Sequence, residues 1–513
     1  MTAQTLCEAL DAACGRWPTR PALSFRGRHT TYGELGRQVD ALAAAYRRME
    51  IARGDRVVCQ LSNRPEHLVA AFAAWRCGAV HVGAHPQLTA RELSTLVGLT
   101  GAVLLVHEPA GDEGDPLATL ARDHPRLRLF PAEGAAGEGS VAGVLAGADA
   151  GTPPPPGNAV DGPSPEDAAA LLVTSGSTGK PKLPMGFHGR LAASWTGLAR
   201  GLGLGPDDVH LAHLPLAHGF GLMLATAGLL GGGRVLLVER FSPAEVLESV
   251  GREGVTVLHG SAAHFRLLLD RLDPALHDLR SLRVGVASAS AFPIPLLRAM
   301  LQGLGMTIMM MYGSSEGVGV ATTDPDEILM GSVGRPEPGS VAIVDGRRRP
   351  VAAGAPGEIA FSRAVFPVRY WSGPEGGQPR SVTRGWYYTG DLGRIDPDGR
   401  LFVLGRVQHR INRGGSKVDP AEVEAALLGC AGVAEAAVIG TPHPVLGETV
   451  CAIVVPSAGP APTLSGVRAE LAGLLAAYKL PEALRIVPAI PRSLLGKVDV
   501  ERLRAEVLET AGA

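Results

Sequence analysis

The chain has 513 residues, of which 46% are hydrophobic and 19% are charged, and its formal net charge at pH 7 is −2. This length exceeds what one hydrophobic core holds and predicts at least two domains. The near-neutral charge argues against nucleic-acid and membrane-surface partners, and no apolar run reaches the ~18 residues that a membrane span needs. The six cysteines lack metal-ligand spacing, and the N-terminus lacks a signal-peptide pattern. We therefore expect a cytoplasmic protein with reduced thiols.

Helical and strand patterns alternate along residues 17–130. Threonine followed three residues later by glutamate, at Thr31 and again at Thr89, predicts capped starts of helices. Residues 56–61 have the composition of a strand, and residues 67–75 that of a largely buried helix. Such alternation is typical of a mainly parallel, doubly wound sheet.

The next segment contains a predicted linker and a predicted strand. Residues 131–165 are rich in Ala, Gly and Pro with almost no large apolar residue, and we interpret them as a long surface loop or subdomain linker. Leu171, Leu172 and Val173 then form an apolar run that indicates a buried strand.

A polar turn rich in hydroxyls, glycine and lysine follows that strand. Glycine lets backbone N–H groups approach an anion, hydroxyls add donors, and lysines supply positive charge, which together suit a polyphosphate. The turn is not a Walker A loop, because Lys180 is followed by Pro181. Its candidate phosphate-binding residues are Thr174, Ser175, Gly176, Ser177, Thr178, Gly179 and Lys182.

Further along, residues 210–223 read HLAHLPLAHGFGLM and contain three histidines. No further ligand cluster has the spacing of a metal site, so packing in a core or exposure to solvent is the plain alternative. A strand and turn at residues 282–293 carries Ser288, Ala289 and Ser290, whose small side chains permit close approach of a ligand. Residues 255–258 are predicted to form another strand.

Three later motifs contain residue types that suit a nucleotide, although on its own each is more simply a glycine turn beside a surface glutamate, a turn former or a solvated lysine. Residues 311–317 read MYGSSEG, in which an aromatic face can stack on adenine, a hydroxyl can reach phosphate and a carboxylate can hold Mg²⁺. Residues 385–391 read GWYYTGD, and the aspartate, which we place on a tight turn, can accept both hydroxyls of a ribose. Residues 491–497 read PRSLLGK and end in a lysine.

Taken in order from Leu171 to Lys497, these motifs resemble those of the adenylate-forming superfamily, which includes acyl- and aryl-CoA synthetases, luciferases and peptide-synthetase adenylation domains. The resemblance implies an α/β fold. A large N-terminal adenylation domain of doubly wound sheets plus a β-rich subdomain would span residues 1–405. A small mobile α+β C-terminal domain carrying the catalytic lysine would span residues 406–513.

The resemblance also implies a role for individual residues. Catalysis is assigned to Lys497, Glu316 and His218, with Glu316 as the metal ligand and Gln408 at the hinge. Besides the phosphate turn, the ATP/AMP-binding set comprises Ser288, Ala289, Ser290, Met311, Tyr312, Gly313, Ser314, Ser315, Asp391 and Arg406. The acyl pocket comprises His218, Gly219, Phe220, Gly221, Ala263 and Gly313, and the thiol tunnel Gly414 and Gly415. His210 and His213 are expected to be structural.

The chain departs from the family pattern at three places. Ser288, Ala289 and Ser290 replace a Gly-Gly-Ala-like turn, Ser315 replaces a commoner threonine, and Gln408 stands where an acid or lysine is expected. A hinge works through its backbone freedom, so a non-ionic residue is tolerable there.

The implied reaction joins a carboxylic acid to a thiol at the expense of ATP, with Mg²⁺ and coenzyme A as cofactors. No carboxylate follows His218, which disfavours a standard α-amino acid as substrate. Small residues near the pocket allow a bulky or long acyl group. Delivery to an acyl carrier protein's phosphopantetheine is an alternative that uses the same motifs. A third interpretation of the sequence is a non-catalytic ATP-binding protein.

Overall fold

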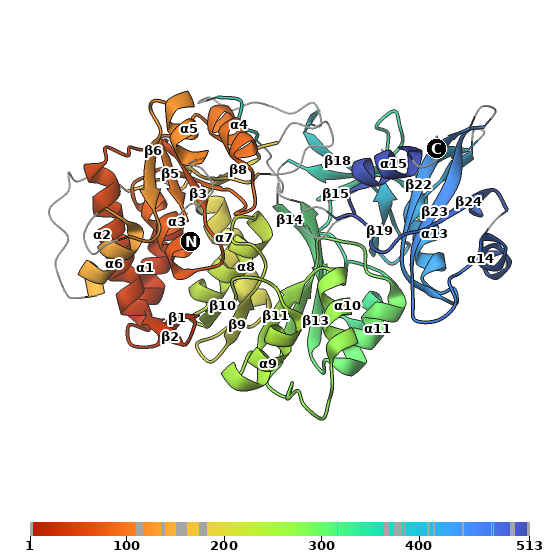
Figure 1. Ribbon diagram of the computed structural model, residues 1–513, viewed down its shortest axis with the longest axis horizontal. Helices are drawn as coiled ribbons and strands as arrows, with labels where there is room; N and C mark the ends of the chain where they lie inside the picture. The colour runs from red at the N-terminus through yellow and green to blue at the C-terminus, as the bar shows by residue number, and fades with distance from the viewer. Residues whose placement is uncertain are drawn as a thin grey trace.

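The computed structural model describes residues 4–108, 116–134, 139–149, 162–173, 182–314, 317–363, 369–373, 382–383, 385–407, 411–413, 416–443, 446–472, 474–475, 477–492 and 498–509. Two large sheets, a third antiparallel sheet and a C-terminal sheet follow one another across the molecule (Figure 1). Within the described ranges, each helix is either too short or too polar to cross a lipid bilayer.

The largest sheet has the order β14-β13-β12-β11-β9-β10-β1-β2 and is parallel except at its two edges, where β14 and β2 run antiparallel to their neighbours. Its strands are β1 (Pro21–Phe25), β2 (Arg28–Thr31), β9 (Val209–Ala212), β10 (Arg234–Leu237), β11 (Val257–Gly260), β12 (Val284–Ala287), β13 (Thr307–Ser314) and β14 (Gly317–Thr322).

The second sheet has the order β6-β5-β3-β4-β7-β8, and only β8 runs antiparallel. Its strands are β3 (Arg56–Gln60), β4 (Val80–Gly83), β5 (Leu104–His107), β6 (Arg128–Pro131), β7 (Ala168–Leu171) and β8 (Met185–Phe187).

Helices cover both faces of each large sheet. The main hydrophobic core joins facing sides of the two sheets through α1 (Leu6–Arg16), α2 (Tyr32–Arg48), α3 (Pro65–Arg76), α6 (Val141–Asp149), α7 (His188–Gly201) and α8 (Gly219–Leu230). The far side of the first sheet carries α9 (Pro243–Glu253), α10 (Ala262–Arg271) and α11 (Ile294–Gly303). The far side of the second carries α4 (Ala90–Thr100) and α5 (Pro116–Asp123). Helices on both faces of mainly parallel sheets confirm the predicted doubly wound fold.

The third sheet is antiparallel and packs beside β13 and β14, with Tyr312 and Val320 in its core. It contains β15 (Val341–Val344), β16 (Gly357–Ser362), β17 (Val382–Thr383), β18 (Trp386–Ile395) and β19 (Leu401–Arg406). The short helix α12 (Pro325–Leu329) precedes it.

The C-terminal unit is a small α+β layer at one end of the molecule (Figure 1). Its sheet contains β20 (Ile411–Arg413), β21 (Ser416–Val418), β22 (Val433–His443), β23 (Gly447–Pro456) and β24 (Ala483–Ile486). Helices α13 (Pro420–Leu427) and α14 (Leu464–Leu471) pack on one face, α15 (Val500–Glu509) packs on the other, and a 3₁₀ turn spans Ala477–Lys479. The predicted α/β fold class is thereby confirmed.

Four local predictions need correction. Residues 131–165 are not all loop, since α6 lies within them and buries its apolar side in the main core. The strand predicted at residues 171–173 is β7, which begins at Ala168 and ends at Leu171 and in which Ala170 and Leu171 pair with β4. The strand predicted at residues 255–258 begins at Val257. Asp391 lies within β18, not on a tight turn, beside an irregularity in the pairing with β19.

Candidate active site

The predicted site residues gather at one edge of the largest sheet. Strands β9, β11, β12 and β13 are neighbours that run parallel, so their carboxyl ends lie side by side. The chain leaves these ends through residues 213–218, Ser261 and residues 288–290, and β13 carries Met311 to Ser314 at its own end. Ligands of open α/β sheets bind at this edge.

His218 occupies the N-cap position of α8 and is half-buried. The backbone N–H of Phe220 donates to its Nδ1 at 3.3 Å, so the neutral ring carries its proton on Nε2. An Nε2–H group is a suitable donor to a carboxylate oxygen. Gly219, Phe220 and Gly221 form the first turn of α8, and Ala263 lies in the first turn of α10.

The loop after β12 is fastened to its neighbours on both sides. The Ser288 hydroxyl donates to the carbonyl of Met311 at 2.8 Å, and the backbone N–H of Ala262 donates to the Ser290 hydroxyl at 2.9 Å. Ala289 between them has a φ of 68°, which is where a glycine would sit without strain. The loop thus joins the predicted adenine side of the site to the start of α10.

Asp391 brings together three predicted nucleotide-binding residues. Its Oδ2 accepts from the hydroxyl of Tyr312 and its Oδ1 pairs with Nε of Arg406, each at 2.8 Å. Burial of the Tyr312 hydroxyl and the charge of Asp391 raise the pKa of Tyr312 well above its ordinary value, so this donor stays protonated. A carboxylate offers about four lone-pair sites. Two are used by these neighbours, and the predicted role of Asp391 in binding the two hydroxyls of a ribose would use the other two.

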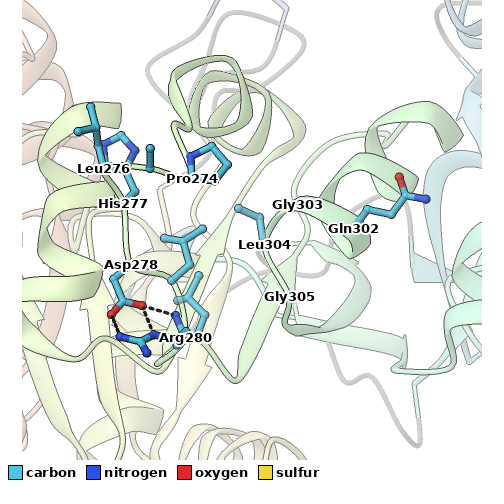
Figure 2. Close-up of a pocket in the computed structure, with 12 residues that line it drawn as sticks. Pro274, Leu276, His277, Asp278, Arg280, Gln302, Gly303, Leu304 and Gly305 are labelled. Atoms are coloured by element: carbon cyan, nitrogen blue, oxygen red, sulfur yellow. Dashed lines mark hydrogen bonds and ion pairs between the residues drawn. The ribbon is translucent and has the colours of Figure 1, made fainter.

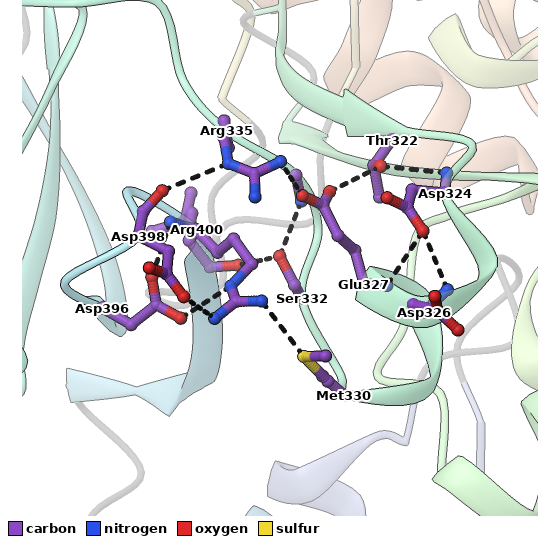
Figure 3. Close-up of polar contacts among 12 residues, drawn as sticks. Thr322, Asp324, Asp326, Glu327, Met330, Ser332, Arg335, Asp396, Asp398 and Arg400 are labelled. Carbon is purple, nitrogen blue, oxygen red and sulfur yellow. Dashed lines mark hydrogen bonds and ion pairs between the residues drawn. The ribbon is translucent and has the colours of Figure 1, made fainter.

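A second polar network holds the β18–β19 hairpin against the end of β14 (Figure 3). Thr322 donates to the buried carboxylate of Glu327 at 2.8 Å, and Arg335 pairs with the same carboxylate. Arg335 also donates to the carbonyl of Asp398 at 3.1 Å, and Arg400 pairs with Asp396 at 2.8 Å. This network ties the hairpin that carries Asp391 and Arg406 to the sheet that carries Tyr312.

The remaining predicted site residues are only partly testable in this structure. Thr174 to Gly179, Ser315, Glu316, Gln408, Gly414, Gly415 and Lys497 lie outside the described residues. Lys182 is exposed. In the described part of the chain, no group of three or more His, Cys, Asp or Glu side chains gathers as metal ligands.

The residues on either side of the segment that contains Lys497 are described. Arg492 and Val498 form an antiparallel bridge. Burial, and after it the charge of Arg492, lowers the pKa of His264 to about 4. Since His264 lies at the start of α10, this effect indicates that Arg492 lies on the side of the C-terminal unit that faces the large domain.

Three buried histidines and the half-buried His264 lie beside the site, and burial keeps them neutral. His210, His213 and His259 are buried, and the rings of His213 and His259 stack with centroids 5.0 Å apart. Burial lowers the pKa of His210 to about 4 and of His259 to about 3, and it lowers the pKa of His213 well below its ordinary value. The ring of His264 contacts that of His213 at 5.3 Å. The structural role expected for His210 and His213 stays a prediction.

A hollow of about 630 Å³ lies elsewhere, between residues 274–282 and 302–305 (Figure 2). Leu282 precedes β12, and Leu304 precedes β13, so the hollow lies at the amino-terminal edge of these strands. This is the edge opposite the predicted site, and its exposed Asp278–Arg280 ion pair engages no predicted residue.

Sequence reasoning missed two residues at the site edge, Asn63 and Gly83. Both belong to the second large sheet or its loops, and both contact the segment that leads to His218. No local pattern marks them, since their partners lie well over a hundred residues away in the chain.

Comparison with known proteins identifies the class. The family model described as "AMP-binding enzyme" matches residues 10–371, and that described as "AMP-binding enzyme C-terminal domain" matches residues 422–497. The chain belongs to this family, the adenylate-forming superfamily, as its motifs predicted.

Individual relatives cover nearly the whole chain. Triostin synthetase I of Streptomyces triostinicus is 36% identical over 99% of this chain and 95% of its own length. The 2-hydroxy-7-methoxy-5-methyl-1-naphthoate–CoA ligase of Streptomyces carzinostaticus is 34% identical over 93% of this chain and 88% of its own. The crystal structure of ATP-bound MatB from Rhodopseudomonas palustris superposes with a TM-score of 0.85, 27% identity, and coverage of 98% and 99%. Further relatives are named as CoA ligases or as carrier-protein ligases. The chain is therefore an adenylate-forming ligase with a nucleotide-binding domain.

Proposed function

We propose that the protein is an ATP-dependent acid–thiol ligase that activates a carboxylic acid as an acyl-adenylate and then forms a thioester with coenzyme A. In the first half-reaction the carboxylate oxygen bonds to the α-phosphorus of MgATP, and the bond to the β-phosphate oxygen breaks to release pyrophosphate. In the second, the thiol bonds to the acyl carbon and loses its proton, and AMP leaves.

The chemical difficulty lies in the first half, because an anion must approach a polyanion. Positioned donors and cations that act where charge develops lower this barrier. We assign the carboxylate to His218 through its Nε2–H group, and the β- and γ-phosphates to the turn from Thr174 to Lys182. Lys497 would bridge the carboxylate and the α-phosphate, and Glu316 would hold the Mg²⁺ that accompanies ATP.

The observation that carries this proposal is the carboxylate of Asp391, fixed between Tyr312 and Arg406 with two lone-pair sites left over. It stands next to the carboxyl ends of β12 and β13, where the adenine loop also begins. A ribose bound there would direct its 5′-phosphates along the same edge toward His218. An ion pair that only stabilised the fold would not need to lie at the carboxyl end of the sheet.

The test is acid-dependent trapping of the adenylate with hydroxylamine. Salicylate, ferulate, 1-naphthoate and octanoate serve as aryl, polycyclic and aliphatic probes, with hydroxamate and pyrophosphate measured together. We expect equimolar hydroxamate and pyrophosphate with at least one probe. Binding of ATP without acid-dependent pyrophosphate release from any probe would favour a non-catalytic nucleotide-binding protein.

The phosphopantetheine of an acyl carrier protein is a second candidate acceptor, because relatives include a fatty acid–[acyl-carrier-protein] ligase and a salicyl-S-ArCP synthetase. The probe acid that yields hydroxamate is then offered with coenzyme A or with a panel of holo-carrier proteins. The acceptor that gives a rate of thioester formation at least about tenfold higher is assigned as the acceptor of this enzyme.

A further inference from the structure

Asn63 is a buried amide that reaches from the second sheet to the loop after β9. The residue follows the end of β3 in the chain and is 4% exposed. Nδ2 donates to the carbonyls of Ala212 at 3.2 Å and Leu214 at 2.9 Å, and Oδ1 accepts from the N–H of Leu216 at 2.9 Å. The amide therefore bonds to the last residue of β9 and to two residues of the loop that follows it.

Two of these bonds, at Leu214 and Leu216, take the place of ones that regular structure would supply, whereas the carbonyl of Ala212 also accepts from the N–H of Val238 at 3.0 Å. Residues 213–218 connect β9 to α8 without a ladder or helix of their own, and buried backbone groups need partners. Asn63 satisfies two of them, the carbonyl of Leu214 and the N–H of Leu216. The loop conformation thus depends on a side chain from another sheet.

Gly83 limits the same loop from a second direction. It ends β4, and a Cβ placed on it would lie 2.2 Å from the carbonyl oxygen of Ala217. Its φ lies outside the left-handed region, so the contact alone requires glycine there. Asn63 and Gly83 together leave the loop little room to move at Leu216 and Ala217, and the next residue is His218.

We propose that Asn63 is a positioning residue for His218, acting through the loop clamp that it forms with Gly83. The clamp sets where α8 begins, and hence where the His218 ring and the first turn of the acyl pocket lie. The inference rests on the proposed function in one respect, namely that His218 contacts the substrate carboxylate.

The kinetic test uses Asn63→Ala and the best acid among salicylate, ferulate, 1-naphthoate and octanoate. We expect the KM for the acid to rise about tenfold or more and the KM for ATP to stay within about twofold. Gln38→Leu is the matched control, because Gln38 is also a buried amide, 6% exposed, and donates to Asp149 at 2.9 Å away from the loop. It should leave the ratio of the two KM values unchanged.

A double-mutant cycle separates positioning from general destabilisation. Added to His218→Ala, the Asn63→Ala change should cost less than about threefold further in kcat/KM for the acid, since both remove the same contribution. Full additivity would overturn the inference while leaving the proposed function intact. An unaltered acid KM in His218→Ala would instead count against the role of His218 in the proposed function.

A substrate-independent measurement accompanies the kinetics. In Asn63→Ala, hydrogen exchange of peptides spanning residues 212–222 should accelerate at least about tenfold, because Leu216 N–H loses its acceptor. Unchanged exchange in a folded variant would overturn the clamp. If Asn63→Ala does not fold, Gly83→Ala displaces the loop without removing a hydrogen bond and should raise the acid KM and the exchange rate alike. No change in either quantity would again refute the proposal.

Discussion

Substitution of Asp391 by asparagine removes the charge at the predicted ribose site and keeps the shape of the side chain. Tyr312 and Arg406 are both donors, and each uses a different carboxylate oxygen. An amide has one oxygen and one NH₂ group. One of the two donors must therefore lose its acceptor, and at least one ribose hydroxyl loses a charged partner.

The size of the effect follows from these contacts. A hydrogen bond to a charged group contributes about 1.5–3 kcal/mol, so ATP affinity should fall about 10- to 150-fold. The cost to folding should be smaller, about 1 kcal/mol, because the Arg406 side chain is 53% exposed and water can solvate it again.

The assay is calorimetric titration of ATP at fixed Mg²⁺ and ionic strength, with a thermal melt of each variant. Asp396→Asn is the matched control, since Asp396 is a similarly buried carboxylate of the same hairpin that pairs with Arg400 at 2.8 Å. Asp396→Asn should lower the melting temperature and leave the affinity for ATP unchanged. Equal ATP affinities of wild type and a folded Asp391→Asn, or the same loss in the control, would refute the assignment.

Two further predictions concern pH and stability. Burial, helped by the charge of Asp419, raises the pKa of Glu424 to about 7. Between about pH 4.5 and 7 the native carboxyl therefore holds a proton that unfolding releases, and stability falls as the pH rises through this range. Glu424→Gln should raise the melting temperature relative to wild type at pH 8 and hardly change it at pH 4.5. Burial opposes the charge of Asp208, but hydrogen bonds from Thr256 and Arg283 outweigh it and lower the pKa of Asp208. The stabilisation by Asp208 is therefore present above the pKa of the unfolded state and is lost as the pH falls through the pKa of the folded state. Asp208→Ala should lower the free energy of unfolding by about 2–3 kcal/mol at pH 7 in urea titrations, and an equal decrease at pH 3 would contradict the mechanism.

Elements with a local signature could be predicted from the sequence. The Thr31 and Thr89 caps each form the reciprocal pair with a glutamate three residues on, as their spacing indicated. The helix at residues 67–75 is buried along its whole length, as its apolar run indicated. These signals are carried within one turn or one helix face and need no tertiary information.

Helix α6 had a local signature that its composition hid. Val141, Val144, Leu145 and Ala148 follow the spacing of one buried helical face. The surrounding Ala, Gly and Pro residues made the whole stretch resemble a linker. A periodicity count restricted to residues 141–149 finds the helix.

Other features could not be found because they depend on residues distant in the chain. Asn63 contacts partners about 150 positions away, and Tyr312 meets Asp391 only because the third sheet packs on β13. The motifs identified which residue types serve the nucleotide. Only the folded chain shows that the Asp391 carboxylate is already half engaged by its neighbours.

The adenylation half-reaction of Lys497→Ala tests the central claim most directly. We would measure ATP–pyrophosphate exchange with the best probe acid, together with ATP binding by the same variant. Loss of one preorganised cationic donor costs about 10²- to 10³-fold in rate, so exchange should fall by at least that factor while the Kd for ATP stays within about threefold. Exchange close to the wild-type rate would contradict acid activation by a lysine delivered from the C-terminal domain.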